Sequence, residues 1–247
     1  MFSPGDRDSL REMLIALAQS DSRISGAAIT GSSALNLEDK WSDIDLAFAV
    51  TEENEISQVI SDWTEIMYEN HGAVHHMDMA SGESFFRVYL LENTLQVDLS
   101  FSPGRSFGAV APSFRLVFGN SQELPKSAWP TSNELIGLGW LYALHARSSI
   151  ARGRVWQAEF MISGFRGQAL ALACSRFGLS PNQGRGFDKL PSEILETFVG
   201  ALVRSLDEAE LRRAYRICGE VFVAEVNRVD PGLANRLGEP LEELTRT

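Results

Sequence analysis

The chain has 247 residues, of which 44% are hydrophobic and 22% charged, a globular composition that indicates neither intrinsic disorder nor a fibrous protein. Its formal net charge of −11 is uneven: residues 1–125 hold 19 Asp and Glu against 7 Lys and Arg (−12), and residues 126–247 hold 14 against 15 (+1). The acidic half disfavours nucleic-acid binding, no apolar run is long enough to span a membrane, and Cys174 and Cys218 are too few for a disulfide framework.

Hydrophobic periodicity predicts a mixture of helices and strands in the first half. Leu10, Leu14 and Leu17 recur at helical spacing, and the stretch NEISQVISDWTEIMYEN carries a second helical stripe. Strand patterns occur in RISGAAIT, WSDIDLAFAV, AVHHMDM, SFFRVYLL, LQVDLSF and FRLVF. We therefore predict an α+β first half, with a mixed β-sheet and flanking helices.

The second half has helical patterns throughout. Residues 119–133, GNSQELPKSAWPTSN, have no hydrophobic period and are predicted to be a linker. After them come NELIGLGWLYALHARSSIARG, VWQAEFMISGFRGQALALACSRFG, SEILETFVGALVRSL and EAELRRAYRICGEVFVAEVNR. We predict domains at residues 1–125 and 126–247, the second an all-α bundle of about four or five helices. Trp140 and Trp156 are predicted to lie in its core or at a domain interface.

Two aspartates in the strand at residues 43–50 are the strongest chemical signal. Side chains two positions apart on a strand share a face, so Asp43 and Asp45 project together, opposite Ile44 and Leu46. Partly buried carboxylates repel each other unless a cation lies between them, and their oxygens suit Mg²⁺ or Mn²⁺. Asp98 lies on the polar face of LQVDLSF, a strand that can lie beside the first. The three aspartates predict a metal site of the kind used for displacement at phosphorus.

A Gly-Ser-Ser turn precedes these aspartates. Gly31-Ser32-Ser33 follows a strand and leads into the helix-like SALNL, an arrangement that presents backbone N–H groups and hydroxyls to a phosphate. Gly31-Ser32, ten intervening residues, Asp43-Ile44-Asp45 and a later strand aspartate together resemble the signature of the DNA polymerase β-like nucleotidyltransferase superfamily. The helical half is similar to that of small bacterial aminoglycoside and lincosamide nucleotidyltransferases.

The resemblance implies a nucleotidyltransferase domain at residues 1–125 and a substrate-binding helical domain at residues 126–247. Asp43 and Asp45 would hold two Mg²⁺ ions, and Asp98 would complete the one that activates the acceptor. The nucleoside triphosphate, taken to be ATP, would have its β and γ phosphates bound by the turn residues Gly31, Ser32 and Ser33. Ser42 is a further nucleotide-binding candidate.

The resemblance also implies a role for the helical half. Glu159 is the candidate for the base that takes the acceptor proton, because it is the sole acid between Arg147 and Arg185. The alternatives are an ion pair of Glu159 with an arginine, and Asp98 as the base. Arg166 and Lys189 are candidates for holding the triphosphate. His75 and His76 alternate on a strand and so face opposite ways, which argues against a ligand pair.

The sequence therefore predicts an enzyme that moves AMP from ATP onto a hydroxyl of a small molecule and releases pyrophosphate. The acidic first half favours a cationic acceptor, such as an aminoglycoside-like antibiotic. Two alternatives are a nucleotidyltransferase that modifies protein or RNA, as in toxin and antitoxin modules, and a nucleotide-binding module without turnover. We expect a cytoplasmic protein, either a monomer or a homodimer, that binds neither nucleic acid nor membrane.

Overall fold

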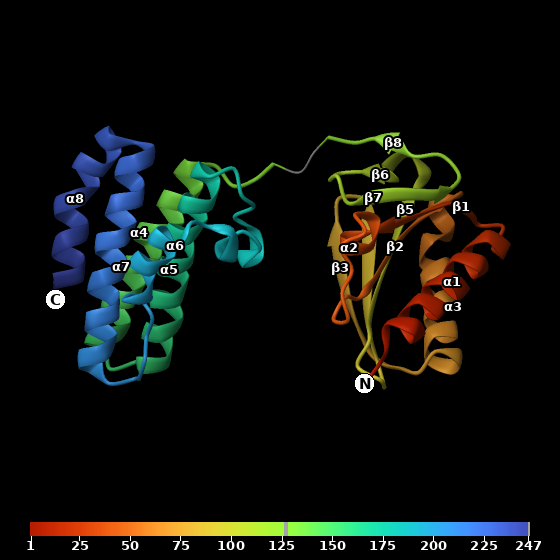
Figure 1. The fold of residues 1–247 in the computed structure, drawn as a ribbon, viewed down its shortest axis with the longest axis horizontal. Helices are drawn as coiled ribbons and strands as arrows, with labels where there is room; N and C mark the ends of the chain where they lie inside the picture. The colour runs from red at the N-terminus through yellow and green to blue at the C-terminus, as the bar shows by residue number, and fades with distance from the viewer. Residues whose placement is uncertain (126–127, 247) are drawn as a thin grey trace. The chain divides into compact units, whose positions relative to one another are not determined.

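Strands and long α-helices are divided between two units of the computed structural model, which describes residues 1–125 and 128–246. The units are Met1–Ser127 and Ala128–Thr247. In the described residues every strand lies in the first unit, and the second is helical (Figure 1). The predicted fold class, an α+β unit with a mixed sheet followed by an all-α bundle, is confirmed.

A six-stranded sheet forms the centre of the first unit, with the strand order β3-β4-β5-β2-β1-β7. Neighbouring strands are antiparallel except for β2 and β5, which run parallel. Between β2 and β5 the chain forms α3 (Ile56–Asn70), β3 and β4. The sheet is mixed because it contains one parallel pair among antiparallel ones. The strands are β1 (Ile24–Thr30), β2 (Ile44–Val50), β3 (Ala73–Ser81), β4 (Ser84–Leu91), β5 (Gln96–Pro103) and β7 (Phe114–Phe118).

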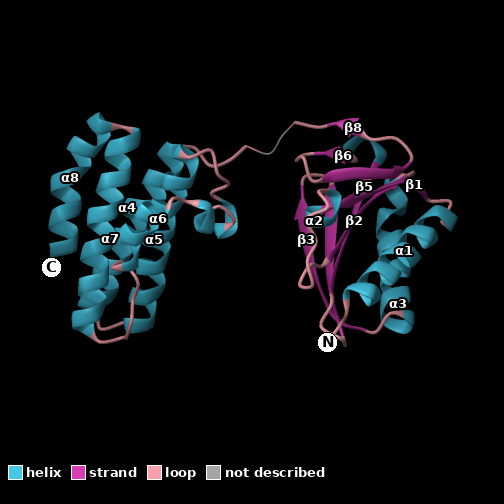
Figure 2. Ribbon diagram, in the orientation of Figure 1, coloured by secondary structure: helices cyan, strands magenta, loops and turns pink. Residues whose placement is uncertain are grey.

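Two helices, α1 (Pro4–Ser20) and α3 (Ile56–Asn70), cover one face of this sheet (Figure 2). The alternation of β2 turns Ile44, Leu46 and Phe48 toward them, and all three side chains are buried. Trp63 of α3 packs against Phe48, with ring centroids 4.7 Å apart. Because side chains alternate along a strand, those at the positions in between point to the opposite face of the sheet.

Helix starts follow the chemistry of their caps. Ser3 precedes α1. Its hydroxyl accepts a hydrogen bond from the backbone N–H of Asp6, and its own backbone N–H donates one to the Asp6 carboxylate. Thr131 and Glu134 form the same reciprocal pair at the start of α4. The short helix α2 (Gly31–Ala34) follows β1 directly, and 3₁₀ turns lie at η1 (Glu53–Glu55) and η2 (Gly104–Ser106).

The predicted linker at residues 119–133 is too long. Its Gln122 and Glu123 form β8 (Gln122–Glu123), which pairs in parallel with β6 (Gly108–Ala109). At its other end, α4 already begins at Ser132. The two-residue pairing is between distant parts of the chain and has no hydrophobic pattern, so the local sequence does not signal it.

Five helices and two 3₁₀ turns make up the described part of the second unit. Their shared core includes Phe165, Tyr215 and Phe222, all buried. Cys174 and Cys218 are buried free thiols in this core. The elements are α4 (Ser132–Ala151), α5 (Val155–Arg176), η3 (Asn182–Gly184), η4 (Phe187–Lys189), α6 (Ser192–Val199), α7 (Glu208–Val229) and α8 (Pro231–Arg246).

One helix predicted for this unit is shorter than expected, and two tryptophans lie outside its core. The helix expected across SEILETFVGALVRSL ends at Val199, because Arg213 of α7 donates hydrogen bonds to the carbonyl oxygens of Gly200 and Leu202. The guanidinium group of Arg213 thus replaces the backbone N–H donors that a longer helix would supply to those carbonyl oxygens. Trp140 and Trp156, predicted to lie in the core or at a domain interface, do not lie in the core: their exposed fractions are 39% and 76%. The interface position stays a prediction. Among the described residues, none of the helices is long and apolar enough to cross a membrane.

Candidate active site

Parallel pairing of β2 with β5 brings three aspartates together. Asp45 lies directly opposite Asp98 in the register, and Asp43 immediately precedes β2. One carboxylate oxygen from each of the three lies within 4.8 Å of the others. All three side chains are half-buried. Alternation placed Asp98 on the polar face of a strand that could lie beside β2, and the structure pairs the two strands so that the three carboxylates converge.

Burial makes this cluster electrostatically unfavourable. The pKa of Asp98 is raised to about 6, chiefly because burial disfavours its charged form, and the neighbouring Asp43 carboxylate raises it further. A hydrogen bond from Gln96 acts in the opposite direction. Converging, half-buried carboxylates form a donor set of hard oxygens, which fits a divalent ion such as Mg²⁺.

Gln96 is a site residue that the sequence analysis did not single out. Its side-chain amide donates hydrogen bonds to Asp98 Oδ1 at 2.9 Å and to Asp43 Oδ2 at 3.3 Å. It lies two positions before Asp98, so it shares that face of β5. This i, i+2 spacing is the signal that could have identified it. Gln96 orients two of the three carboxylates toward each other.

The turn after β1 touches the aspartate cluster. Gly31 has a φ of +63°, and a Cβ atom built there would lie 1.9 Å from Asp45 Oδ2. Only glycine therefore allows the turn to pass this close to the carboxylate. Ser32 is half-exposed, whereas Ser33 is buried and its hydroxyl accepts a hydrogen bond from Arg11 at 3.0 Å. The side chain of Ser32 and the backbone of the turn are thus the parts available to a phosphate.

Two arginines of α1, neither singled out by the sequence analysis, hold the end of this turn and the loop that follows it. Arg7 is buried and donates a hydrogen bond of 2.6 Å to the carbonyl oxygen of Asp39. Arg11 bonds to Ser33 and forms an ion pair with Glu38. They occupy successive turns of the helix, at i and i+4, which could have signalled a common partner. Together they fix the loop that leads into Asp43.

Ser42 lies in that loop, directly before Asp43. Its hydroxyl accepts a hydrogen bond from the backbone N–H of Asp39 at 2.9 Å and donates one to Asp39 Oδ1 at 3.1 Å. The same carboxylate accepts from the backbone N–H of Trp41 at 2.8 Å. Ser42 thus stabilises the approach to β2, and its contact with a nucleotide stays a prediction.

The other predicted residues lie in the second unit. Glu159, in the first turns of α5, accepts a hydrogen bond of 2.7 Å from the hydroxyl of Ser163. Arg166 donates to that hydroxyl at 3.2 Å and to the carbonyl oxygen of Ala201 at 3.3 Å. Lys189 is exposed at the end of η4. Glu159 and Arg166 thus join one hydrogen-bonded chain through Ser163, and their roles toward the aspartates stay predictions.

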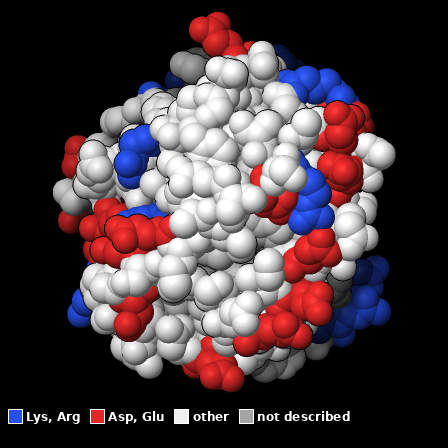
Figure 3. Space-filling view, turned by 90° about the vertical axis from the view of Figure 1, so that its right-hand side faces the viewer, with Lys and Arg blue, Asp and Glu red and all other residues white. Residues whose placement is uncertain are grey.

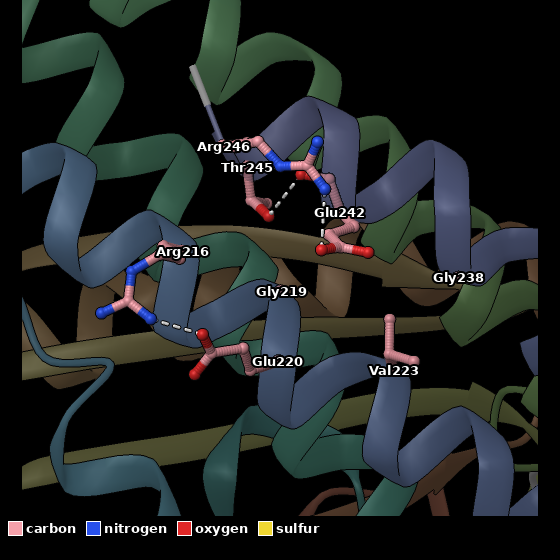
Figure 4. Close-up of a pocket in the computed structure, with 8 residues that line it drawn as sticks. All are labelled: Arg216, Gly219, Glu220, Val223, Gly238, Glu242, Thr245 and Arg246. Carbon is pink, nitrogen blue, oxygen red and sulfur yellow. Dashed lines mark hydrogen bonds and ion pairs between the residues drawn. The ribbon is translucent and has the colours of Figure 1, made fainter.

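A cavity of about 450 Å³ lies between α7 and α8, apart from these residues (Figure 4). Ion pairs Arg216–Glu220 and Arg246–Glu242 line it, each within one helix. Exposed i, i+4 pairs of this kind contribute little to stability. The arginine and glutamate side chains at this cavity are therefore already paired with each other. None of the residues that the sequence predicted for the site lines it.

The first unit is acidic beyond its three clustered aspartates. Acidic side chains are more widespread than basic ones on the face drawn in Figure 3. Several of its arginines are engaged with carboxylates: Arg23 with Asp21 and Asp62, and Arg87 with Asp78. The unpaired excess is therefore negative, which favours cations near this unit.

Comparison with known proteins leaves the chain without an assigned family. No protein-family model and no curated protein match it. Among solved structures, the crystal structure of an aminoglycoside 6-adenyltransferase from Bacillus subtilis matches 98% of this chain and 99% of its own length, with 16% identity and a TM-score of 0.43. This likeness is weak. It agrees with the kind of protein that the sequence motifs resemble, but it adds no argument about function.

Proposed function

We propose that the protein is a nucleotidyltransferase that moves AMP from ATP onto a hydroxyl group of a small molecule. The observation that carries the proposal is the convergence of Asp43, Asp45 and Asp98 next to the Gly31 turn. Carboxylates that can share divalent ions, placed beside a glycine turn that follows a strand, suit the binding and displacement of a triphosphate.

Each group has a defined task in this reaction. Asp43, Asp45 and Asp98 would hold Mg²⁺, which when bound neutralises phosphate charge and favours displacement at phosphorus. The Gly31–Ser33 turn and Ser32 would hold the β and γ phosphates. The acceptor oxygen forms a bond to the α-phosphorus, the bond from that phosphorus to the bridging oxygen breaks, and pyrophosphate leaves. The acceptor proton passes to a carboxylate, either Glu159 or Asp98.

The charge of the first unit supports a small acceptor over a nucleic acid. A net charge of −12 on residues 1–125 repels a phosphate backbone, whereas it attracts cationic compounds such as aminoglycosides. An aminoglycoside-like antibiotic is therefore one acceptor to test, which would make the protein a resistance enzyme.

The test is pyrophosphate release with Mg²⁺, each of the four ribonucleoside triphosphates and a panel of hydroxyl acceptors. We expect release with ATP, and we expect Asp45→Asn to lower it about 100-fold or more, because a metal ligand is lost. Glu69→Gln, which alters an exposed carboxylate of α3, should leave the rate unchanged.

Two outcomes would contradict the proposal. If wild-type protein binds no triphosphate in the presence of Mg²⁺, the site is not a nucleotide site. If transfer occurs only to protein or RNA, the reaction class holds but the acceptor class is wrong.

A further inference from the structure

An apolar surface continues from the aspartate cluster across the open face of the sheet. In the strand register, Asp98 is opposite Val88 of β4, and Val88 is opposite Met77 of β3. The row beside it runs from Ser100 to Phe86 and Met79, and on the other side Gln96 is opposite Leu90. We call this surface the β3–β4 platform; it consists of Met77, Met79, Phe86, Val88 and Leu90.

The platform is open to solvent. The exposed fractions are 54% for Met77, 49% for Leu90 and 47% for Met79, and Phe86 and Val88 are half-buried. Large apolar side chains grouped in this way on a protein surface usually mark a contact site. Methionine in particular adapts its shape to different partners.

The neighbouring parts of the same face are already covered. Phe107 is buried against Ala28 of β1 and Ala49 of β2, so it closes the face over those strands. The Arg87–Asp78 ion pair of β3 and β4 lies on the reverse face, with 2.6 Å between Arg87 Nε and Asp78 Oδ1, and Arg87 also bonds to Thr64 of α3. His75 is the titratable residue on the platform side, opposite Leu90. The platform therefore presents apolar side chains beside the aspartates and directs its strands' charges away from them.

The geometry of the reaction indicates what occupies the platform. The Gly31 turn follows β1 and meets Asp45, so the triphosphate lies toward the β1 side of the aspartates. In-line displacement places the attacking oxygen opposite the leaving pyrophosphate. The acceptor hydroxyl therefore approaches from the other side of Asp45, where β5, β4 and β3 follow in the sheet.

The size of the platform suits a small molecule. Neighbouring strands are about 4.8 Å apart, so Val88 lies about 5 Å and Met77 about 10 Å from Asp98 across the sheet. That reach matches one or two rings of an acceptor. A peptide added to the outer edge of β3 would lie about 14 Å from Asp98, too far to present a hydroxyl at the aspartates.

We propose that the acceptor is an amphipathic hydroxyl compound whose apolar part, an alkyl or aryl group, lies on the β3–β4 platform. This assignment rests on the proposed nucleotidyltransferase activity and narrows its acceptor class. A polyaminated sugar carries no alkyl or aryl substituent for this surface, so we expect it to be the weaker acceptor even though the acidic unit attracts its charge. The platform residues thus determine specificity, and they hold the acceptor without taking part in bond formation.

The kinetic test uses Val88→Thr and Met77→Gln, which keep side-chain size and add polarity. Pyrophosphate release is measured with short alkyl and aryl glycosides, with the unsubstituted sugars and with polyaminated sugars. We expect a KM about tenfold lower for the substituted glycosides than for the parent sugars, from burial of one small apolar group. Each variant should raise that KM and leave ATP affinity unchanged. Met13→Gln, which alters an equally exposed methionine of α1, is the control.

A second measurement does not depend on turnover. The chain has six methionines, whose methyl groups can be labelled with ¹³C and assigned by substitution. An aryl glycoside should shift the NMR signals of Met77 and Met79 and leave that of Met13 in place.

The outcomes separate the two proposals. Pyrophosphate release without shifts at Met77 and Met79, or variants that behave like Met13→Gln, would overturn the platform assignment alone. A preference for polyaminated sugars would do the same. Failure to bind ATP with Mg²⁺ and to release pyrophosphate with every acceptor would overturn the proposed function, and the platform's role as an acceptor site with it.

Discussion

At Gly31, the absence of a Cβ atom is what allows the turn to lie against the Asp45 carboxylate. Its φ of +63° strains any other residue, and the Cβ position is 1.9 Å from Asp45 Oδ2. Gly82, in the turn between β3 and β4, has a similar φ of +60° with nothing within 4 Å of its Cβ position. The two glycines share a backbone conformation and differ in their surroundings.

Gly31→Ala and Gly82→Ala should therefore separate the effect of backbone strain at positive φ from the effect of a steric clash with Asp45. We expect each to lower the free energy of unfolding by about 1 kcal/mol from the backbone conformation, and Gly31→Ala by more. In a titration with ATP and Mg²⁺, only Gly31→Ala should weaken binding, because its methyl group displaces the Asp45 carboxylate. Equal binding by both variants would show that the close contact is not needed.

Asp98 makes the metal-free protein sensitive to pH. Its pKa in the folded protein is about 6, above the ordinary value of 3.8, so the folded state holds the proton more tightly than the unfolded state does. The resulting stability is fully present below about pH 4 and is lost as the pH rises through about 6. Asp98→Asn should remove this dependence and, at pH 7 without metal, raise the melting temperature by on the order of a few degrees.

Thermal unfolding between pH 4 and 8, with EDTA and then with Mg²⁺, tests this expectation. Mg²⁺ should reverse the order, stabilising the wild type more than Asp98→Asn. Asp188→Asn, which alters an exposed acid of η4, serves as the control. A lower melting temperature for metal-free Asp98→Asn at pH 7 would mean that the aspartate stabilises the fold as a charge.

Helix packing in the second unit depends on glycines that the hydrophobic pattern does not mark. A Cβ atom at Gly139 of α4 would lie 2.3 Å from the ring of Phe222 in α7, whereas one at Gly137 would meet nothing within 4 Å. Gly139→Ala should therefore lower the free energy of unfolding by about 1–3 kcal/mol through overpacking. Gly137→Ala should raise it by about 0.5–1 kcal/mol. Urea unfolding followed by circular dichroism would test both, and a similar effect of the two substitutions would contradict the packing argument.

Elements with a strong local period were predictable, and those set by distant contacts were not. The alternation of Ile44, Leu46 and Phe48 identified β2 and the face that carries Asp45, which led to the aspartate cluster. The end of α6 depends on Arg213, fourteen positions beyond Val199, so its local apolar pattern continued past the true helix. The hydrogen bond from Arg7 to the carbonyl oxygen of Asp39 likewise joins α1 to a loop that is distant in the sequence.

At the scale of the whole molecule, the two units have separate hydrophobic cores. One contains Trp63 and Phe101 of the first unit, and the other Phe165 and Phe222 of the second. Independent cores commonly unfold as separate cooperative units. Differential scanning calorimetry should resolve two transitions. Mg²⁺ should raise the melting temperature of only one of the two transitions, because a ligand stabilises the unit that binds it. In Asp45→Asn, that transition should no longer respond to Mg²⁺. A single transition that shifts as a whole with Mg²⁺ would contradict this expectation.

The parallel pairing of β2 with β5 also ties the site to the course of folding. Asp45 and Asp98 are 53 positions apart, and α3, β3 and β4 lie between their strands. Closing so long a loop is a slow, non-local event compared with forming a helix or a hairpin. A partly folded chain that has its helices and the β3–β4 hairpin still lacks the third carboxylate at the cluster. During refolding, the gain of tight Mg²⁺ binding therefore marks the moment at which β5 joins β2.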